Sequence, residues 1–365
     1  MKKRYWIALI VFVIGLLLSA GTYFLSDVYQ KDDVAVITDT KIKDRLIEKD
    51  KDVYNNVDQT REQTLHIKIL SGKYKGKTFT EKNVYYPSQL TTQKYRPRQR
   101  IFVSIQKGKV ALGNPKRDWV LVLVLTLTIA LMIAMAGKHT IALLISMLLS
   151  WIIFYGVIVL DVKLNGAYII LLFGLADVVF SFISLLIVQG LNKKMLATWL
   201  ATLLGVFVSF GLCYVIMKLT GESEMKYETG DYATQDPRGI FLAQSLLGVL
   251  GAVMDEATDI ISSLYEVVQV KKNITAKQLI QSGRTMGQEI MGPLINVLVL
   301  IFIAGALPMT IIYLRDNNSL SSAFGFTLSL GATQSVISAI SIVLTVIFAT
   351  GCSLLFLKEK RGQNK

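Results

Sequence analysis

Long, uninterrupted apolar runs constrain this sequence more than any other feature. A helix needs about twenty consecutive apolar residues to cross a hydrocarbon core about 30 Å thick, and several runs reach that length. Hydrophobic residues make up 52% of the 365 residues, and within the runs they do not alternate with polar ones. The sequence therefore predicts an α-helical polytopic membrane protein in a lipid bilayer.

The first predicted span is an N-terminal transmembrane anchor, residues 1–25, which begins with a basic cluster at residues 2–4. Small residues at 19–21 could serve as a signal-peptidase site. The apolar run continues to Leu25, which favours an uncleaved anchor and leaves cleavage as the alternative. In either case we expect the chain that follows to be exported.

Seven further spans are predicted to form a transmembrane domain, residues 119–357, followed by a basic cytoplasmic tail, residues 358–365. With the anchor they make about eight transmembrane helices. Residues 319–335 are too polar and glycine-rich for another span, so we interpret them as an interfacial or re-entrant segment. The expected spans are Trp119–Ala136, Thr140–Leu160, Gly166–Gln189, Met195–Met217, Gly239–Ile261, Ile290–Leu314 and Val336–Leu357.

Residues 26–118 are the only soluble region of any size, and we expect one small exported domain there. VAVIT at 34–38 is a candidate strand, although the first half of the region is otherwise charged and poor in large apolar residues. LHIKIL at 65–70 and RIFVSI at 100–105 alternate apolar and polar residues, as strands do, and a glycine-containing turn, SGKYKG, follows the first of them. The pattern predicts a β-rich barrel or sandwich that folds alone.

The formal net charge of +13 is explained by topology, because cytoplasmic loops are enriched in Lys and Arg. The loops on the opposite side are poor in basic residues, and the longest, residues 221–239, is mainly acidic. We therefore expect cytoplasmic N- and C-termini, an extracellular domain at 26–118 and no nucleic-acid partner. The basic loops carry Lys138, Lys193, Lys194, Lys271, Lys272, Lys277, Arg284, Lys358, Lys360 and Arg361.

Cysteine and histidine give no sign of a cofactor. Cys213 and Cys352 both fall within apolar runs, so no disulfide framework is indicated. His66 and His139 lie far apart in the sequence, with no partner Cys or His nearby. A zinc site built on these residue types is not expected, and we predict neither a metal nor another cofactor.

Carboxylates inside the predicted spans are the candidate functional residues. In GAVMDEATDIISS, Asp255 lies about 24 Å along its span and Asp259 about 6 Å further, near the cytoplasmic interface. Glu256 points away from them, while Gly248 and Gly251 are expected to let another helix pack closely. Helical spacing predicts a single stripe made of Gln244, Gly248, Ala252, Asp255, Asp259, Ser262 and Glu266.

Two other spans supply further polar residues. Asp177 lies midway along its span, at the deepest charged position in the chain. In the seventh span, Glu289, Gly292 and Asn296 share a helix face, and Pro293 is expected to break the helix, as in the interrupted helices of transporters. The alternatives are structural: an intramembrane amide often only joins helices, and Asp259 and Glu266 could lie in the inner headgroup region.

The intramembrane acids have no matching Lys or Arg within the spans. Each carboxyl must then be protonated or must bind a cation, and both states suit a proton- or cation-coupled pathway. We expect the substrate or ion to pass near Asp177, Asp255, Asp259, Glu289 and Asn296. The sharpest form of this hypothesis is that Asp177 and Asp255 face one polar cavity.

Two blocks of the sequence resemble the YibE/F family of bacterial multi-pass membrane proteins. They are GVLGAVMDEATDIISSLYEV and SGRTMGQEIMGPLINVLVLIFIAGALP, and the exported region adds the SGKYKGK turn followed by Asn83. The resemblance implies motif carboxylates at Asp255 and at Glu289, where an aspartate is expected and the longer side chain puts a tight ion-binding geometry in doubt. It also implies a partner, either a shorter sister membrane protein of the family or another copy of the chain.

These features together predict a transporter or permease component without enzymatic activity. One alternative is a membrane scaffold or sensor that acts through the exported domain. A weaker alternative is an intramembrane aspartyl protease, which would need Asp177 and Asp255 in one acid–base geometry. The motifs expected of such a protease are not present, because the sequence has Ala176-Asp177 and Met254-Asp255 at the two aspartates.

Overall fold

The computed structural model describes residues 2–24, 33–87, 92–106, 109–137, 139–222, 225–227, 236–271 and 274–362. Some parts of the sequence analysis lie outside these ranges. They are Lys138, Lys272, the predicted boundary between residues 25 and 26, most of the acidic loop, and the side chains of the basic tail. The chain divides into two compact units, Met1–Thr140 and Ile141–Lys365.

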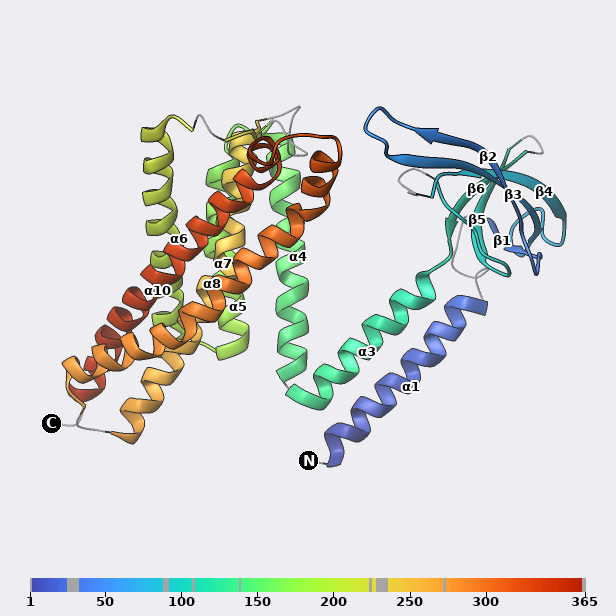
Figure 1. The fold of residues 1–365 in the computed structure, drawn as a ribbon. Coiled ribbons are helices and arrows are strands. Elements are labelled where there is room, and N and C mark those ends of the chain that lie inside the picture. The colour runs from blue at the N-terminus through green and yellow to red at the C-terminus, as the bar shows by residue number, and fades with distance from the viewer. Residues whose placement is uncertain are drawn as a thin grey trace. The chain divides into compact units, whose positions relative to one another are not determined.

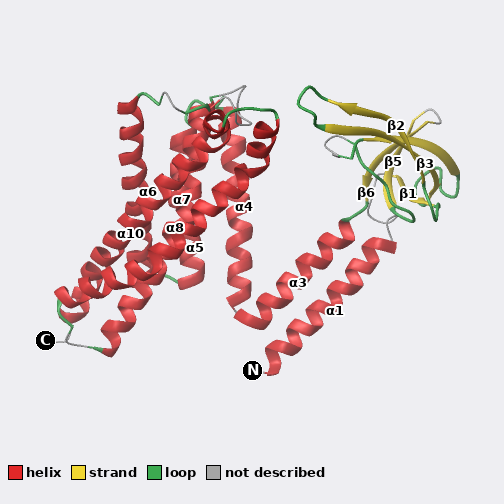
Figure 2. Ribbon diagram, viewed as in Figure 1, coloured by secondary structure: helices red, strands yellow, loops and turns green. Residues whose placement is uncertain are grey.

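The described chain is mostly helical, with a small antiparallel sheet after the first helix (Figures 1 and 2). Eight of its helices are long and apolar enough to cross a membrane, which confirms the expected number. The last of them combines three consecutive elements. The helices are α1 (Lys2–Phe24), α3 (Asp118–Ala136), α4 (His139–Lys163), α5 (Ile169–Gln189), α6 (Lys193–Thr220), α7 (Pro237–Val270), α8 (Ala276–Arg315) and the run α9 (Leu320–Ala323), η2 (Phe324–Leu328) and α10 (Ser329–Gly362).

The sheet in the first unit has six strands. Its order is β2-β3-β1-β5-β6, and β4 pairs with the other edge of β3. Alternate residues of these strands, among them Ile37, Leu65, Ile67 and Ile101, form a buried core inside the sheet. The strands are β1 (Asp33–Ile37), β2 (Lys43–Lys51), β3 (Val57–Ile69), β4 (Thr78–Tyr85), β5 (Arg100–Gln106) and β6 (Lys109–Pro115).

The three predicted strands are confirmed as β1, part of β3 and β5. The turn after β3 is confirmed too, with Gly72 and Gly76 at φ values of 77° and 88°, which favour glycine. The sequence analysis missed β2, which is exposed along nearly its whole length and pairs only with β3. An edge strand with two solvated faces carries charged residues and shows no apolar alternation.

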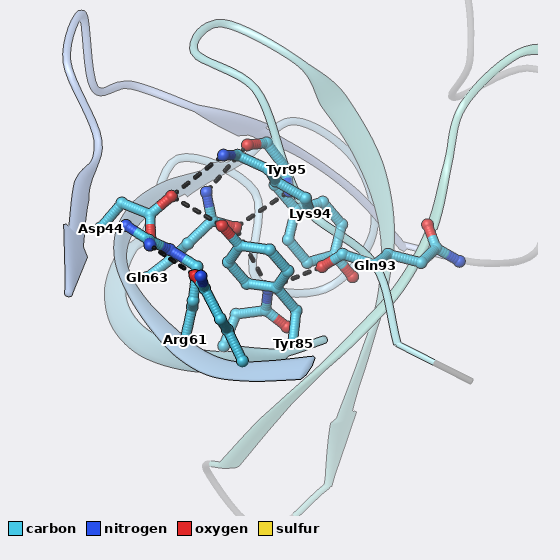
Figure 3. A network of polar contacts seen from close by, with 9 residues as sticks. Asp44, Arg61, Gln63, Tyr85, Gln93, Lys94 and Tyr95 are labelled. Atoms are coloured by element: carbon cyan, nitrogen blue, oxygen red, sulfur yellow. Dashed lines mark hydrogen bonds and ion pairs between the residues drawn. The ribbon is translucent and has the colours of Figure 1, made fainter. Parts of the chain in front are cut away.

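A polar network holds the irregular segment after β4 against the sheet (Figure 3). The buried Gln63 amide donates to the backbone oxygen of Tyr95 at 3.0 Å and accepts from its backbone nitrogen at 2.9 Å. Nearby, the Asp44 carboxylate accepts from Arg61 at 2.8 Å and from the Tyr85 hydroxyl at 2.7 Å, and pairs with Lys94 at 3.1 Å. These side chains replace the backbone hydrogen bonds that a further strand would have made.

Asp44 makes the stability of this domain depend on pH. Burial raises the pKa of the Asp44 carboxyl, but hydrogen bonds from Arg61, Tyr85 and Lys94 outweigh burial and lower it overall. A carboxyl whose pKa is lower in the folded state stabilises the fold above its unfolded pKa of about 4, and this stability is lost as pH falls through the folded pKa.

We therefore expect Asp44→Asn to destabilise the excised domain, residues 26–118, by about 1–2 kcal/mol at neutral pH and by much less in acid. Urea unfolding followed by circular dichroism at pH 7 and near pH 3 measures the difference. Asp50→Asn, an exposed change on β2, is the control. Equal losses for Asp44→Asn at both pH values would contradict the prediction.

Helices α1 and α3 pair along their length, and the pair carries the sheet (Figure 1). A Cβ atom at Gly15 would overlap the side chain of Thr126, so the two helices need glycine there. The fully buried ammonium of Lys116 donates to the backbone oxygen of Thr22 at 2.5 Å and pairs with Asp118 at 2.8 Å. Arg100 lies 4.0 Å from the ring of Tyr23. Cations at the carboxyl end of α1 satisfy its last carbonyls and its dipole.

The core of the second unit forms around α10, which packs against α6, α7 and α8. Glycines allow these close approaches: a Cβ atom at Gly205 of α6 would overlap Thr345 of α10 and lie 2.9 Å from Cγ1 of Val253 of α7. Gly283 and Gly287 of α8 are equally close to α10. Small residues at such crossings are typical of helix packing in membranes.

The last helix corrects the sequence analysis. The expected span began at Val336 after a re-entrant segment, whereas helix begins at Leu320 and continues through the π-helical turn η2 into α10. The polar side chains that made this segment unlike a span are satisfied internally, because they bond to carbonyls four residues back. They are Thr327 to Ala323, Ser329 to Gly325, Thr333 to Ser329 and Ser335 to Gly331.

Helix α8 brings two more corrections. It begins at Ala276, so Lys277 and Arg284 lie on a helix and not in a loop. It also continues through Pro293 and Pro308, so Pro293 removes one backbone hydrogen bond without breaking the helix.

Candidate functional site

One face of α7 carries a line of polar and small residues away from the packed core. We call Gln244, Gly248, Ala252, Asp255, Asp259, Ser262 and Glu266 the α7 stripe. Five of its members are exposed, and Ala252 and Ser262 are half-buried. The opposite face is packed, with Leu246, Val253, Ile260 and Leu264 all buried. The stripe predicted from helical spacing thus lies on one face, but that face is open in the single chain.

A cavity lies at each end of the α7 stripe. The first, of about 290 Å³, lies between α7, α8 and the η2–α10 segment and includes Gln244. The second, of about 470 Å³, lies between the end of α7 and α8 and includes Glu266 and Lys271. Asp255 and Asp259 are exposed on the same helix face between them. The stripe therefore joins two hollows through a pair of carboxylates.

Two other carboxyls lie inside the helix packing. Asp177 on α5 has no exposed surface, and Glu256 on α7 is 1% exposed. Within the described part of the chain, neither oxygen of either carboxyl has a hydrogen-bond partner. The hydroxyl nearest to Asp177 in the sequence is that of Ser181, and it donates to the backbone oxygen of Asp177 and not to its carboxyl. An ionised carboxylate without a partner is too costly in such a place, so each must be protonated or must bind a cation.

Helices α6 and α10 also bury hydroxyl groups. The Ser209 and Ser341 hydroxyls are 2.5 Å apart across the two helices. Thr198, Thr202 and Thr345 are fully buried as well. All five hydroxyls also bond to the carbonyl four residues back. Two further buried hydroxyls of α10, those of Ser338 and Ser353, have no hydrogen-bond partner in the described part of the chain.

An ion pair joins Glu222, just after the end of α6, to Arg238 in the first turn of α7. Arg238 donates three hydrogen bonds to the Glu222 carboxylate, at 2.6, 2.8 and 3.0 Å, and the Tyr227 hydroxyl donates another at 2.8 Å. The bonds from Arg238 lower the pKa of Glu222, more than burial raises it, and Tyr227 adds to the lowering. This pair fixes the start of α7, and with it the Gln244 end of the α7 stripe.

Comparison with known proteins now adds a family. The chain matches the YibE/F-like protein family over residues 124–359 and the YibE/F family N-terminal domain over residues 27–114. The chain belongs to the YibE/F family. The resemblance noted in the sequence is confirmed over nearly the whole chain. A search of curated proteins and a search of solved structures found no match.

The two matched ranges of this YibE/F protein meet near the predicted domain boundary at residues 118–119. The compact units divide later, after Thr140, because α3 packs against α1. Most of helix α3 thus belongs to the YibE/F-like range by sequence, and the helix belongs to the first unit by packing.

The predicted site residues of the YibE/F protein do not all come together. Glu289, Gly292 and Asn296 are exposed on α8 and do not line either cavity. Gly248 is closely packed, since a Cβ atom there would lie 2.7 Å from Nε2 of Gln334. A Cβ atom at Gly251 or at Gly292 would have no neighbour within 4 Å, so neither glycine serves packing inside the described chain.

The hypothesis that Asp177 and Asp255 face one cavity does not fit this arrangement. Asp177 is fully buried, Asp255 is exposed on the α7 stripe, and neither lines the two cavities. Side chains that could form a metal centre do not gather either: the described residues contain no group of three or more His, Cys, Asp or Glu placed to hold a metal ion.

Glu256 is the functional candidate that sequence reasoning missed. It was set aside because it points away from the α7 stripe, and the structure shows that it points into the protein. The signal was present: Glu256 follows Val249 and Val253 by seven and three residues and precedes Ile260 by four, so it shares their face. Those apolar residues mark the buried face, and an acid among them must be buried too.

Proposed function

We propose that this YibE/F protein is a component of a membrane transporter or permease, coupled to the movement of a proton or another cation. The observation that carries the proposal is the pair of buried carboxyls, Asp177 and Glu256, whose oxygens have no hydrogen-bond partners. Keeping such groups among packed helices costs stability, which a function in proton or cation transfer would explain. The exposed acids Asp255 and Asp259 between two cavities support a path along α7.

In the proposed arrangement the protein lies in the cell membrane with both termini in the cytoplasm and residues 26–118 outside. The basic residues on α6 and α8, at Lys193, Lys194, Lys277 and Arg284, support this orientation. We further propose a sister YibE/F-like protein or a second copy as partner. Asp255 and Asp259 support such a partner. They are exposed acids in a predicted membrane span, so a partner or water must cover them.

A flux measurement tests the coupling. The full-length protein is reconstituted into liposomes that contain a pH-sensitive dye, and a potassium gradient with valinomycin drives cation entry. We expect Asp177→Asn to reduce the flux about tenfold or more, since an amide cannot change charge and a barrier increase of about 1.4 kcal/mol already gives that factor.

Glu48→Gln, an exposed change on β2, is the control and should leave the flux unchanged. An Asp177→Asn protein that carries protons as fast as the wild type would contradict a role for this carboxyl. Absence of proton flux in the wild type, and of sodium flux in liposomes that contain a sodium-sensitive dye instead, with the protein folded, would contradict cation coupling altogether.

The rival proposal is a scaffold or sensor that acts through the exported domain. One observation favours it: Lys116 and Arg100 bind the carbonyl end of α1, so a force on the sheet reaches the helix directly. The same flux assay separates the proposals, because a scaffold needs neither Asp177 nor Glu256.

A further inference from the structure

The cavity at the Gln244 end of the α7 stripe has an aromatic lining. Phe241 comes from α7, Phe302 and Tyr313 come from α8, and Phe326 comes from η2. The amides of Gln244 and Gln334 add polar groups to the same wall. At about 290 Å³ the space is near the lower end of the range of small-molecule pockets, about 300–1,000 Å³.

The aromatic wall is held in place by specific contacts. The rings of Tyr313 and Phe326 stack at 6.0 Å with an angle of 25° between their planes. The hydroxyls of Thr310 and Thr327 lie 2.7 Å apart and join α8 to η2 beside the cavity. The wall also contains the π-helical turn itself, a rare element that is frequent at functional sites.

The chemistry of the lining selects the charge of a ligand. None of the described residues that line the cavity is charged, so an anion would find no cation among them to pair with. The faces of aromatic rings carry negative potential and attract cations, most strongly where water is excluded. A wholly apolar molecule would leave the Gln334 amide facing it unsatisfied.

The surroundings of the cavity favour the same charge. Asp255 and Asp259 follow Gln244 on the same face of α7, and both are exposed. A cation that leaves the aromatic cavity along the α7 stripe therefore meets carboxylates next. An anion would be repelled there.

We propose that this cavity binds an organic cation, a quaternary or substituted ammonium with an apolar body. Ring faces contact the cationic centre and its alkyl groups, and the amide oxygen of Gln334 faces its polar substituents. The proposed binding names a substrate class for the proposed transporter. It rests on the proposed function only in what happens to the cation after it has bound.

Equilibrium binding of radiolabelled choline to the full-length protein in nanodiscs tests the proposal. Its neutral carbon isostere, 3,3-dimethylbutan-1-ol, is the competitor that lacks only the charge. Gly331→Leu fills the cavity, and the backbone has room for it, since a Cβ atom there would lie 3.6 Å from Phe302. Phe326→Leu removes one ring but keeps the wall apolar.

We expect saturable choline binding that is about tenfold or more weaker in both variants and is not displaced by the neutral isostere. Gly211→Leu on α6, where a Cβ atom would have no neighbour within 4 Å, should bind as the wild type does. No saturable binding, full binding in Gly331→Leu, or equal displacement by the isostere would overturn the proposal. Choline binding without any flux in liposomes would support the binding site and contradict the proposed transport. Proton flux without choline binding would support the proposed transport and contradict the binding site.

Discussion

Replacing Glu256 with methionine is expected to make the protein more stable and to abolish the proposed cation-coupled flux. The glutamate is 1% exposed and neither of its oxygens has a partner, so the folded state carries an uncompensated desolvation cost. Methionine has a similar shape and no polar group, and removing the cost should stabilise the fold by about 1–3 kcal/mol. Thermal unfolding in detergent measures the gain.

The matched control is Glu266→Met on the same helix. Glu266 is exposed, so its replacement should change stability by no more than about 0.5 kcal/mol. A Glu256→Met protein that is less stable than the wild type would mean that the carboxyl has a stabilising partner. A stabilised variant with normal flux would mean that Glu256 is not used in transport.

Replacing Gly205 with leucine is expected to prevent correct packing of the second unit. Gly205 lies where α6 meets both α7 and α10, and a Cβ atom there would overlap Thr345 and lie 2.9 Å from Val253. Three packed helices cannot move apart for one side chain without losing contacts elsewhere, and overpacking of this kind costs about 1–3 kcal/mol or more. We expect the yield of monodisperse protein in size-exclusion chromatography to collapse.

Gly211→Leu, six residues further along α6, should purify normally, because a Cβ atom at Gly211 has no neighbour within 4 Å. Normal yield and stability of the Gly205→Leu protein would contradict the close packing of α6, α7 and α10. Equal loss for both variants would instead point to a general intolerance of α6.

Apolar run length and helical spacing predicted the eight long helices and the α7 stripe, because both depend on local periodicity. Spacing also carried a signal that the face with Val253, Glu256 and Ile260 is buried, because large apolar residues line that face. The small residues of the stripe outweighed this signal, since they too are typical of packed helices, and so Glu256 was passed over although it is 1% exposed. A stripe of small and polar residues looked like a packing face, whereas the larger apolar residues on the other side made the core.

Polarity misled the sequence analysis in two places for one reason. Residues 319–335 look too polar for a span, yet their hydroxyls bond within the helix and the segment continues into α10. Strand β2 looks too charged for a strand, yet as an edge strand it buries almost nothing. In both cases composition reports exposure and side-chain chemistry, while the backbone conformation is set by neighbours in space.

The central claim is that Asp177 and Glu256 carry protons, or exchange them for another cation, inside the helix packing. Infrared difference spectroscopy of the reconstituted protein tests it most directly, because a protonated carboxyl has a C=O band that a carboxylate lacks. We predict such a band in the wild type at neutral pH, reduced in Asp177→Asn, reduced in Glu256→Gln and absent in the double variant. A wild type without the band whose flux responds to no cation, or a band that survives in the double variant, would contradict the claim.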